Sequence, residues 1–141
     1  MIGSDFGLPL QASGPIESSL QTSASSMALN AKRMELSIQN LVNQRTLDYS
    51  RKLAVVSSVP EGFSDAATAD IVEIVPDTSP KEKYYEPWHP NADQDGYVTY
   101  SNVSPEIEMI NFRQAQRNYE MSVRAYAETK KMWMESLSIL R

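Results

Sequence analysis

Residues 105–141 read PEIEMINFRQAQRNYEMSVRAYAETKKMWMESLSILR, and this stretch decides the expected fold. Ser104 suits the N-cap of a helix and Pro105 its first position, with Glu106 and Glu108 where the helix dipole favours negative charge. No later Gly or Pro interrupts the stretch. Apolar and aromatic residues then recur at alternating steps of three and four, the a/d pattern of a coiled coil. They are Met109, Phe112, Tyr119, Val123, Tyr126, Trp133, Leu137 and Leu140.

A helix of this length exceeds the size of one small domain. At 1.5 Å per residue it would be roughly 50 Å long, whereas a small domain is about 30 Å across. Gln116 and Lys130 fall in the same seam. A polar residue there costs stability but can fix register or choice of partner. We therefore expect this helix to pack against partners beyond one compact core.

A second and weaker heptad stripe predicts an N-terminal helix over residues 15–44. Pro15 suits its first position, and Glu17 lies in the first turn. Ser and Thr crowd the early half of the helix and lower its intrinsic helicity, so we expect order to come from packing. The stripe consists of Leu20, Ala24, Met27, Ala31, Met34, Ile38 and Leu41. Residues 1–14, with scattered Gly and Pro, are expected to form an irregular arm.

The insert between the helices, residues 45–104, has a different composition. It holds most of the prolines and three β-prone runs separated by turn-forming clusters. These runs are residues 53–56, 71–75 and 97–100, and residues 84–90 are expected to be extended rather than regular. The predicted fold class is α+β. Two long terminal helices, 15–44 and 105–141, form a coiled-coil-like layer through their apolar seams, with a small β-rich insert between them.

Composition excludes several classes of protein. Eighteen acidic residues against thirteen Lys and Arg give a net charge of −5, which argues against a nucleic-acid-binding module. The chain has no Cys, so disulfides and thiolate sites are absent. No run approaches the ~18 apolar residues of a membrane span. The N-terminus lacks the pattern of a cleavable secretory signal, so we expect either a cytoplasmic protein or export by another route.

The strongest local motif for ion chemistry is Asn91-Ala92-Asp93-Gln94-Asp95-Gly96. Oxygen ligands at positions one, three and five and Gly at six match the start of an EF-hand loop, but the twelfth position is Asn102 rather than Glu. We expect a polar turn before a strand that begins at Tyr97. His89 is the only histidine, and neither a phosphate loop nor a nucleophile elbow is present. We therefore expect no catalytic residues, no cofactor and no metal.

The chain resembles the flagellar basal-body proximal rod proteins of the FlgC type from about Leu20 to Leu140. The signature lies in residues 85–98, YEPWHPNADQDGYV, followed by Asn102-Val103, and its matching positions are Tyr85, Pro87, Pro90, Ala92, Asp93, Gly96, Tyr97 and Val98. Residues 40–46, NLVNQRT, are similar to a motif shared by flagellar axial proteins. The chain departs from the family pattern at Gln39, Val42 and Ser122.

The resemblance implies a structural subunit of a tubular rod that crosses the periplasm and transmits torque. Its partners would be other copies, other rod proteins and the flagellar type III export apparatus, with no cleaved signal peptide. Phe6 and Leu10 are weakly similar to an export-gate signal. The residues expected at the assembly interface are Leu20, Met27, Met34, Ile38, Asn40, Leu41, Asn43, Met109, Phe112, Tyr119, Val123, Tyr126, Trp133, Leu137 and Leu140.

Two other readings of the residues remain open. The chain could be a self-contained helical adaptor that binds one partner helix through its aromatic row, or an ion-binding module centred on residues 91–96. An adaptor would form a discrete dimer or heterodimer, whereas a rod subunit would polymerise.

Overall fold

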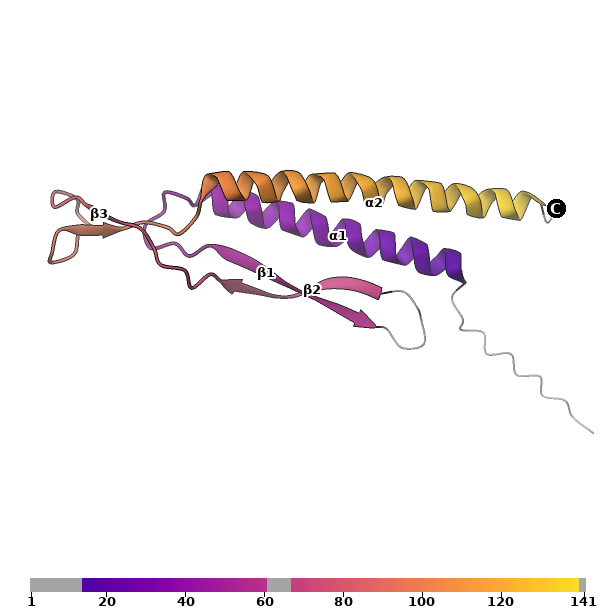
Figure 1. The fold of residues 1–141 in the computed structure, drawn as a ribbon, viewed down its shortest axis with the longest axis horizontal. Helices are drawn as coiled ribbons and strands as arrows, with labels where there is room; N and C mark the ends of the chain where they lie inside the picture. The colour runs from indigo at the N-terminus through magenta and orange to yellow at the C-terminus, as the bar shows by residue number, and fades with distance from the viewer. Residues whose placement is uncertain (1–13, 61–66, 140–141) are drawn as a thin grey trace, which may run out of the picture.

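A computed structural model describes residues 14–60 and 67–139 of the chain. The described residues form two long helices and four strands in the order α1, β1, β2, β3, β4, α2, and the helices lie side by side (Figure 1). This arrangement confirms the predicted α+β class. The expected N-terminal arm apart from Gly14, with Phe6 and Leu10, and the last interface residue Leu140 lie outside the described residues.

The helices are α1, Pro15–Val42, and α2, Pro105–Ile139. Both begin at a proline, whose missing N–H costs nothing in the first turn. Gly14 caps α1 in an extended conformation without a side-chain bond. The hydroxyl of Ser104 donates to the Glu106 carboxylate, 3.0 Å away, so the acidic group is held at the positive end of α2.

The first hairpin packs on α1. Strands β1, Lys52–Pro60, and β2, Ala67–Pro76, pair antiparallel with a register shift between Val55 and Val56. Both strands contact α1, which lies between the hairpin and α2 (Figure 1). The described parts therefore form three layers: α2, then α1, then the hairpin. A lone two-stranded hairpin is at best marginally stable, so its packing on α1 supports it.

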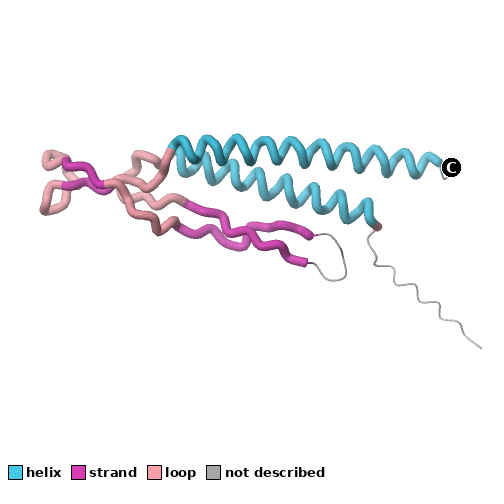
Figure 2. The backbone as a smooth tube through the Cα atoms, viewed as in Figure 1, coloured by secondary structure: helices cyan, strands magenta, loops and turns pink. Residues whose placement is uncertain are grey.

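A second hairpin forms the tip of the molecule, beyond the ends of both helices. Strands β3, Lys83–Tyr85, and β4, Tyr97–Thr99, pair antiparallel (Figure 2). The prediction of three strands with an irregular segment at 84–90 was therefore wrong, because residues 83–85 become a strand by pairing with β4. Two edge-to-face tyrosine pairs support this hairpin, Tyr84 with Tyr100 and Tyr85 with Tyr97.

The described part of the chain has only a small hydrophobic core. In the described part, the buried apolar side chains are only Leu36, Val98 and Ala115, fewer than the buried polar and charged ones. Large apolar residues are exposed along most of α2 instead. Since soluble monomers rarely expose extended apolar surface, this distribution indicates that the helices are covered by other molecules.

Gly96 is required by the turn of the tip, and replacing it by Ala is expected to destabilise the protein by about 1–3 kcal/mol. Its φ is +81°, and an added Cβ would lie 3.0 Å from a ring carbon of Tyr85 and 3.2 Å from Cβ of Pro87. Thermal unfolding measures the loss. In Gly14→Ala the added Cβ meets nothing within 4 Å, so that variant reports only the cost of losing the glycine cap of α1. A Gly96→Ala variant that melts at the temperature of the unaltered protein would contradict the prediction.

Candidate assembly surface

Small polar residues form the seam between α1 and α2. The Ser26 and Ser122 hydroxyl oxygens are 2.8 Å apart, and those of Ser19 and Thr129 are 3.4 Å apart. Seven residues forward along α1, from Ser19 to Ser26, thus correspond to seven residues backward along α2, from Thr129 to Ser122. Two further steps of seven toward the insert bring the amide of Asn40 to the carboxylate of Glu108, 3.3 Å apart. The seam is therefore a regular antiparallel heptad contact made of hydroxyl, amide and carboxylate groups.

The serines satisfy their own hydrogen bonds within the seam. Ser23 donates to the carbonyl of Ser19 at 2.9 Å, and Ser122 donates to the carbonyl of Asn118 at 2.9 Å. Such bonds let a small hydroxyl side chain sit in a helix contact without an unpaired donor. Asn30 donates to the carbonyl of Ser26, but its Oδ1 atom is buried and has no partner among residues 14–60 and 67–139.

Several members of the predicted apolar rows lie one residue away from this seam. Leu20, Met27 and Leu41 each follow a seam residue directly, and so do Met109 and Val123 on α2. None of the described members of the predicted apolar rows is buried. The expectation that the two helices pair through apolar seams was therefore wrong. Small polar residues allow close approach within the chain, and the apolar rows flank this contact with side chains that are half-buried or exposed.

The described apolar interface residues differ in how far they are covered. Leu20, Met27, Met34, Leu41, Phe112 and Tyr119 are half-buried, and Ile38, Met109, Val123, Tyr126, Trp133 and Leu137 are exposed. Gln116 and Lys130 are exposed on the same helix, and Gln116 donates to Glu120 at 3.3 Å. Together the two sets form a surface of apolar and aromatic side chains along the helix pair, which we call the outward rows.

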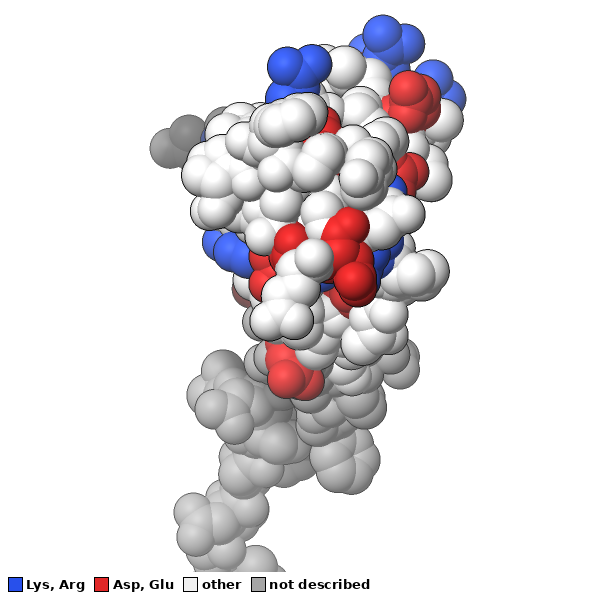
Figure 3. All heavy atoms as spheres, turned by 90° about the vertical axis from the view of Figure 1, so that its left-hand side faces the viewer, with Lys and Arg blue, Asp and Glu red and all other residues white. Residues whose placement is uncertain are grey.

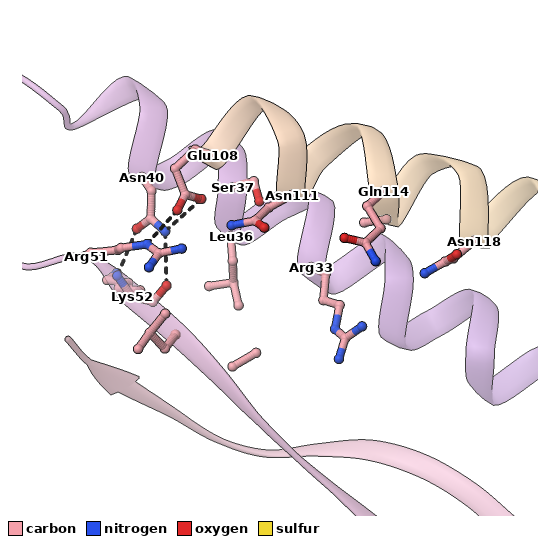
Figure 4. Close-up of a pocket in the computed structure, with 13 residues that line it drawn as sticks. Arg33, Leu36, Ser37, Asn40, Arg51, Lys52, Glu108, Asn111, Gln114 and Asn118 are labelled. Atoms are coloured by element: carbon pink, nitrogen blue, oxygen red, sulfur yellow. Dashed lines mark hydrogen bonds and ion pairs between the residues drawn. The ribbon is translucent and has the colours of Figure 1, made fainter. Parts of the chain in front are cut away.

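A buried polar cluster joins the helices to the insert. Glu108 is 2% exposed, and its Oε1 accepts a hydrogen bond from Nε of Arg51 at 2.6 Å. The amide nitrogen of Asn40 donates to Oε2 of Glu108 and to the carbonyl of Lys52, and Oδ1 of Asn40 accepts from the backbone N–H of Lys52 at 2.9 Å. We call Asn40, Arg51 and Glu108 the polar hub (Figure 4).

Two further residues extend the polar hub. Oδ1 of Asn102 accepts from the backbone N–H of Arg51 at 2.7 Å, and its amide donates to the carbonyls of Asp77 and Ser79. The Tyr49 hydroxyl donates to Oδ1 of Asn40 at 3.1 Å. Burial, and then the negative charge of Glu108, raises the pKa of Tyr49, so this donor keeps its proton at neutral pH.

The hub corrects the expected role of Asn40, and a bond next to it gives Asn43 a role within the chain. Asn40 was expected at the assembly interface, but it is 1% exposed and fastens the end of α1 to β1. Asn43 caps the end of α1, because its amide donates to the carbonyl of Gln39 at 2.8 Å. Sequence reasoning missed Arg51 altogether. It treated Glu108 as a first-turn acid and as part of a match to the start of the C-terminal helix of the FlgC type, and it did not connect Glu108 with Asn40 or Asn102.

The family signature builds the tip. Oδ1 of Asp93 accepts from the backbone N–H groups of Asp95 and Tyr97 at 3.0 and 2.8 Å. Gly96 leaves room for Tyr85 and Pro87, and Val98, the middle residue of β4, is buried. Pro90, Ala92 and Val103 lie in the connecting loops. These signature residues thus have a visible structural role in one small loop-rich hairpin.

Calcium addition is expected to produce no heat in a calorimetric titration at millimolar ion. One oxygen of Asp93 is already used by two backbone donors, so the EF-hand-like spacing forms a turn. Within the described residues, no three His, Cys, Asp or Glu side chains are grouped as metal ligands would be. A saturable calcium heat that disappears in Asp93→Asn but not in Glu73→Gln would contradict this expectation.

The outer face of the tip combines acidic and aromatic side chains. Figure 3 looks onto this end of the molecule and shows acidic groups gathered near its centre. Trp88 is 95% exposed, and Tyr84 and Tyr85 are exposed beside it. No helix within residues 14–60 and 67–139 is both long and apolar enough to cross a bilayer. The tip and the outward rows are thus the two candidate contact surfaces.

Comparisons with known proteins agree with the motifs. The family described as Flagellar basal body rod FlgEFG protein C-terminal matches residues 94–139. The chain is 31% identical to the flagellar basal-body rod protein FlgC of Bacillus subtilis, across 86% of this chain and 95% of the relative. It is 27% identical to FlgC of Buchnera aphidicola subsp. Schizaphis graminum, across 85% and 94% of the two chains. It is 26% identical to FlgC of Salmonella typhimurium, across 82% and 90%.

Proposed function

This chain belongs to the FlgC family of flagellar basal-body rod proteins and is a structural subunit of that rod, and we propose that it polymerises through the outward rows of its two terminal helices. The partners we propose are other copies of the chain and other rod proteins. The observation that carries this proposal is the placement of a polar seam inside the chain and apolar rows outside it.

The energetics of the isolated chain support this proposal. The three buried apolar side chains in the described part of the chain provide little hydrophobic stabilisation for a folded domain. The outward rows hold the large side chains whose burial would contribute ~2 kcal/mol each. If those rows are covered only in the assembly, much of the stability of the helices comes from neighbours. We therefore expect the helix ends of the free chain to exchange amide protons faster than those of the assembled chain.

We propose that the rod formed in this way crosses the periplasm as its proximal part and transmits torque. Long parallel or antiparallel helices with extended packing resist bending because each helix is held by contacts along its whole length. A tube that grows by addition of subunits requires heterologous contacts that do not close into a ring. The unequal ends of this molecule, with helices at one end and an acidic hairpin at the other, suit contacts of that kind.

We also propose that the chain reaches the rod through the flagellar type III apparatus, without cleavage of a signal peptide. Helices joined by a polar seam separate at a lower cost than helices joined by a large apolar seam. A chain that gains much of its order on joining partners can pass a narrow channel in an extended state.

The proposal is tested by isolating basal bodies from the bacterium that makes this chain. We expect the full-length chain in the rod fraction and loss of rods and motility when its gene is deleted, both restored by a plasmid copy. Intact N-terminal sequence in the isolated rod would support export without cleavage. Absence of the chain from basal bodies, or a discrete dimer by light scattering at all concentrations, would favour the adaptor instead.

A further inference from the structure

A third candidate contact surface lies at the waist of the molecule, where α1, α2 and β1 meet. A cavity of about 200 Å³ opens there beside the polar hub. Its floor includes the buried side chains of Leu36, Ser37 and Ala115. Figure 4 shows residues of all three elements around it. We call this cavity the waist pocket.

The wall of the waist pocket carries hydrogen-bonding side chains that have no partner. Arg51 and Glu108 are satisfied by each other and by their neighbours. In the described part of the chain, five other lining side chains make no hydrogen bond or ion pair: Arg33, Lys52, Asn111, Gln114 and Asn118. In Figure 4 the side chains of Arg33, Gln114 and Asn118 carry no dashed line. The pocket is thus a set of unused donors around a buried floor.

The charge of the waist pocket is opposite to that of the chain. Its lining contains three cations, Arg33, Arg51 and Lys52, against the single carboxylate of Glu108, whereas the whole chain has a net charge of −5. An excess of cationic and amide donors is suited to a carboxylate, which accepts hydrogen bonds from guanidinium and amide groups. The ligand class that the pocket fits is therefore a carboxylate side chain.

The tip supplies a carboxylate of the required kind. Residues 82–96 contain Glu82, Glu86, Asp93 and Asp95 against one lysine. Glu82 and Glu86 accept hydrogen bonds from tyrosines, and Asp93 accepts two from the backbone. Within the described residues, the carboxylate of Asp95 has no hydrogen-bond partner and is exposed. Asp95 is thus the acidic side chain of the tip that remains available.

One molecule cannot bring these two surfaces together. The tip projects beyond the ends of the helices and away from the waist (Figure 1). We propose that the acidic tip of one copy docks at the waist pocket of a neighbouring copy, with the Asp95 carboxylate facing Arg33. This inference rests on the proposed polymerisation and names one of its contacts. The contact joins different surfaces of the two copies, so it propagates along an open assembly.

The absence of Cys in the chain makes this contact directly measurable. Basal bodies are isolated from cells whose only copy carries both Arg33→Cys and Asp95→Cys, and mild oxidation is applied. We expect a ladder of disulfide-linked multimers, because each copy donates its tip to the next, and no ladder from either single variant. Neither side chain makes a hydrogen bond in the described part, so the fold should tolerate both changes; circular dichroism checks this.

Charge reversal supplies a second readout. Arg33→Glu and Asp95→Arg are each expected to lower the amount of the chain in basal bodies roughly tenfold, and the double variant should restore most of it. Glu73→Arg on β2 is the control, with the same change of charge as Asp95→Arg and no expected loss.

The possible failures are distinguishable. If basal bodies contain the double-cysteine chain but show no ladder, or if the charge-reversed pair shows no mutual rescue, the tip-to-waist contact is overturned and the rod function stands. If the unaltered chain is absent from basal bodies, the rod function itself fails.

Discussion

Replacing Glu108 by Ala is expected to lower the free energy of unfolding of the free chain by about 3–5 kcal/mol. The substitution leaves the Arg51 guanidinium without the carboxylate that lies 2.6 Å from its Nε, and it removes an acceptor from the Asn40 amide. Breaking a buried pair from one side is costly because the remaining charge is partly desolvated. The Arg51 side chain is 20% exposed and keeps the Asp77 carboxylate 3.6 Å from its Nη1 atom, so we expect a loss at the lower end of this range. Urea denaturation followed by far-UV circular dichroism measures the change.

An effect of this size would remove a large part of the stability of a small domain, which is typically about 5–15 kcal/mol. Glu128→Ala, on the exposed face of the same helix, is the matched control and should change stability by no more than about 0.5 kcal/mol. Arg51→Met combined with Glu108→Met should cost less than the two single changes together. Additive losses, or a Glu108→Ala variant as stable as the control, would show that the hub is not a coupled unit.

The helices could be predicted from sequence because their signals are local. Pro15 and Pro105 mark the starts, Asn43 follows the end of α1, and heptad stripes run between them. Each of these signals acts within a few turns of helix and needs no knowledge of the rest of the fold. The turn at Gly96 could also be predicted, because its signal is local: glycine readily adopts the positive φ that this turn needs.

The face on which the helices meet could not be predicted from the stripes. An apolar row predicts that another surface will pack on it, but it does not show whether that surface belongs to the same chain or to a partner. Here Ser19 and Ser26, the residues directly before Leu20 and Met27, make intramolecular contacts with α2. In a chain that assembles, the apolar rows are available to partners, so the strongest hydrophobic pattern identifies the outer surface.

The polar hub was beyond sequence reasoning for a different reason. Asn40, Arg51 and Glu108 are far apart in the chain and meet only when both helices and β1 are placed. A charged residue in the first turn of a helix is most simply explained by the helix dipole, which is how Glu108 was interpreted. The pairing of residues 83–85 with 97–99 was missed similarly, since a three-residue strand has too little pattern to recognise.

Replacing Trp133 by Asp is expected to abolish incorporation into the rod while leaving the free chain folded. Trp133 is 42% exposed, and it belongs to the same row as Tyr126, which is 36% exposed. In the free chain an aspartate at this position keeps its hydration. If the outward row is covered in the assembly, as proposed, an unpaired carboxylate there would lose its water without gaining a partner. A penalty of about 3 kcal/mol or more would reduce subunit affinity by roughly a hundredfold.

The matched control for this prediction is Lys131→Asp. It introduces the same side chain two residues away, about 200° around the helix and therefore on the opposite face. Basal-body yield, swimming motility and far-UV circular dichroism should be measured for both variants. If the outward rows carry assembly, Trp133→Asp keeps its helicity but loses rods, whereas Lys131→Asp keeps both. Rods of normal yield containing Trp133→Asp would mean that this row faces solvent in the assembly, and that the helices join their neighbours through another side.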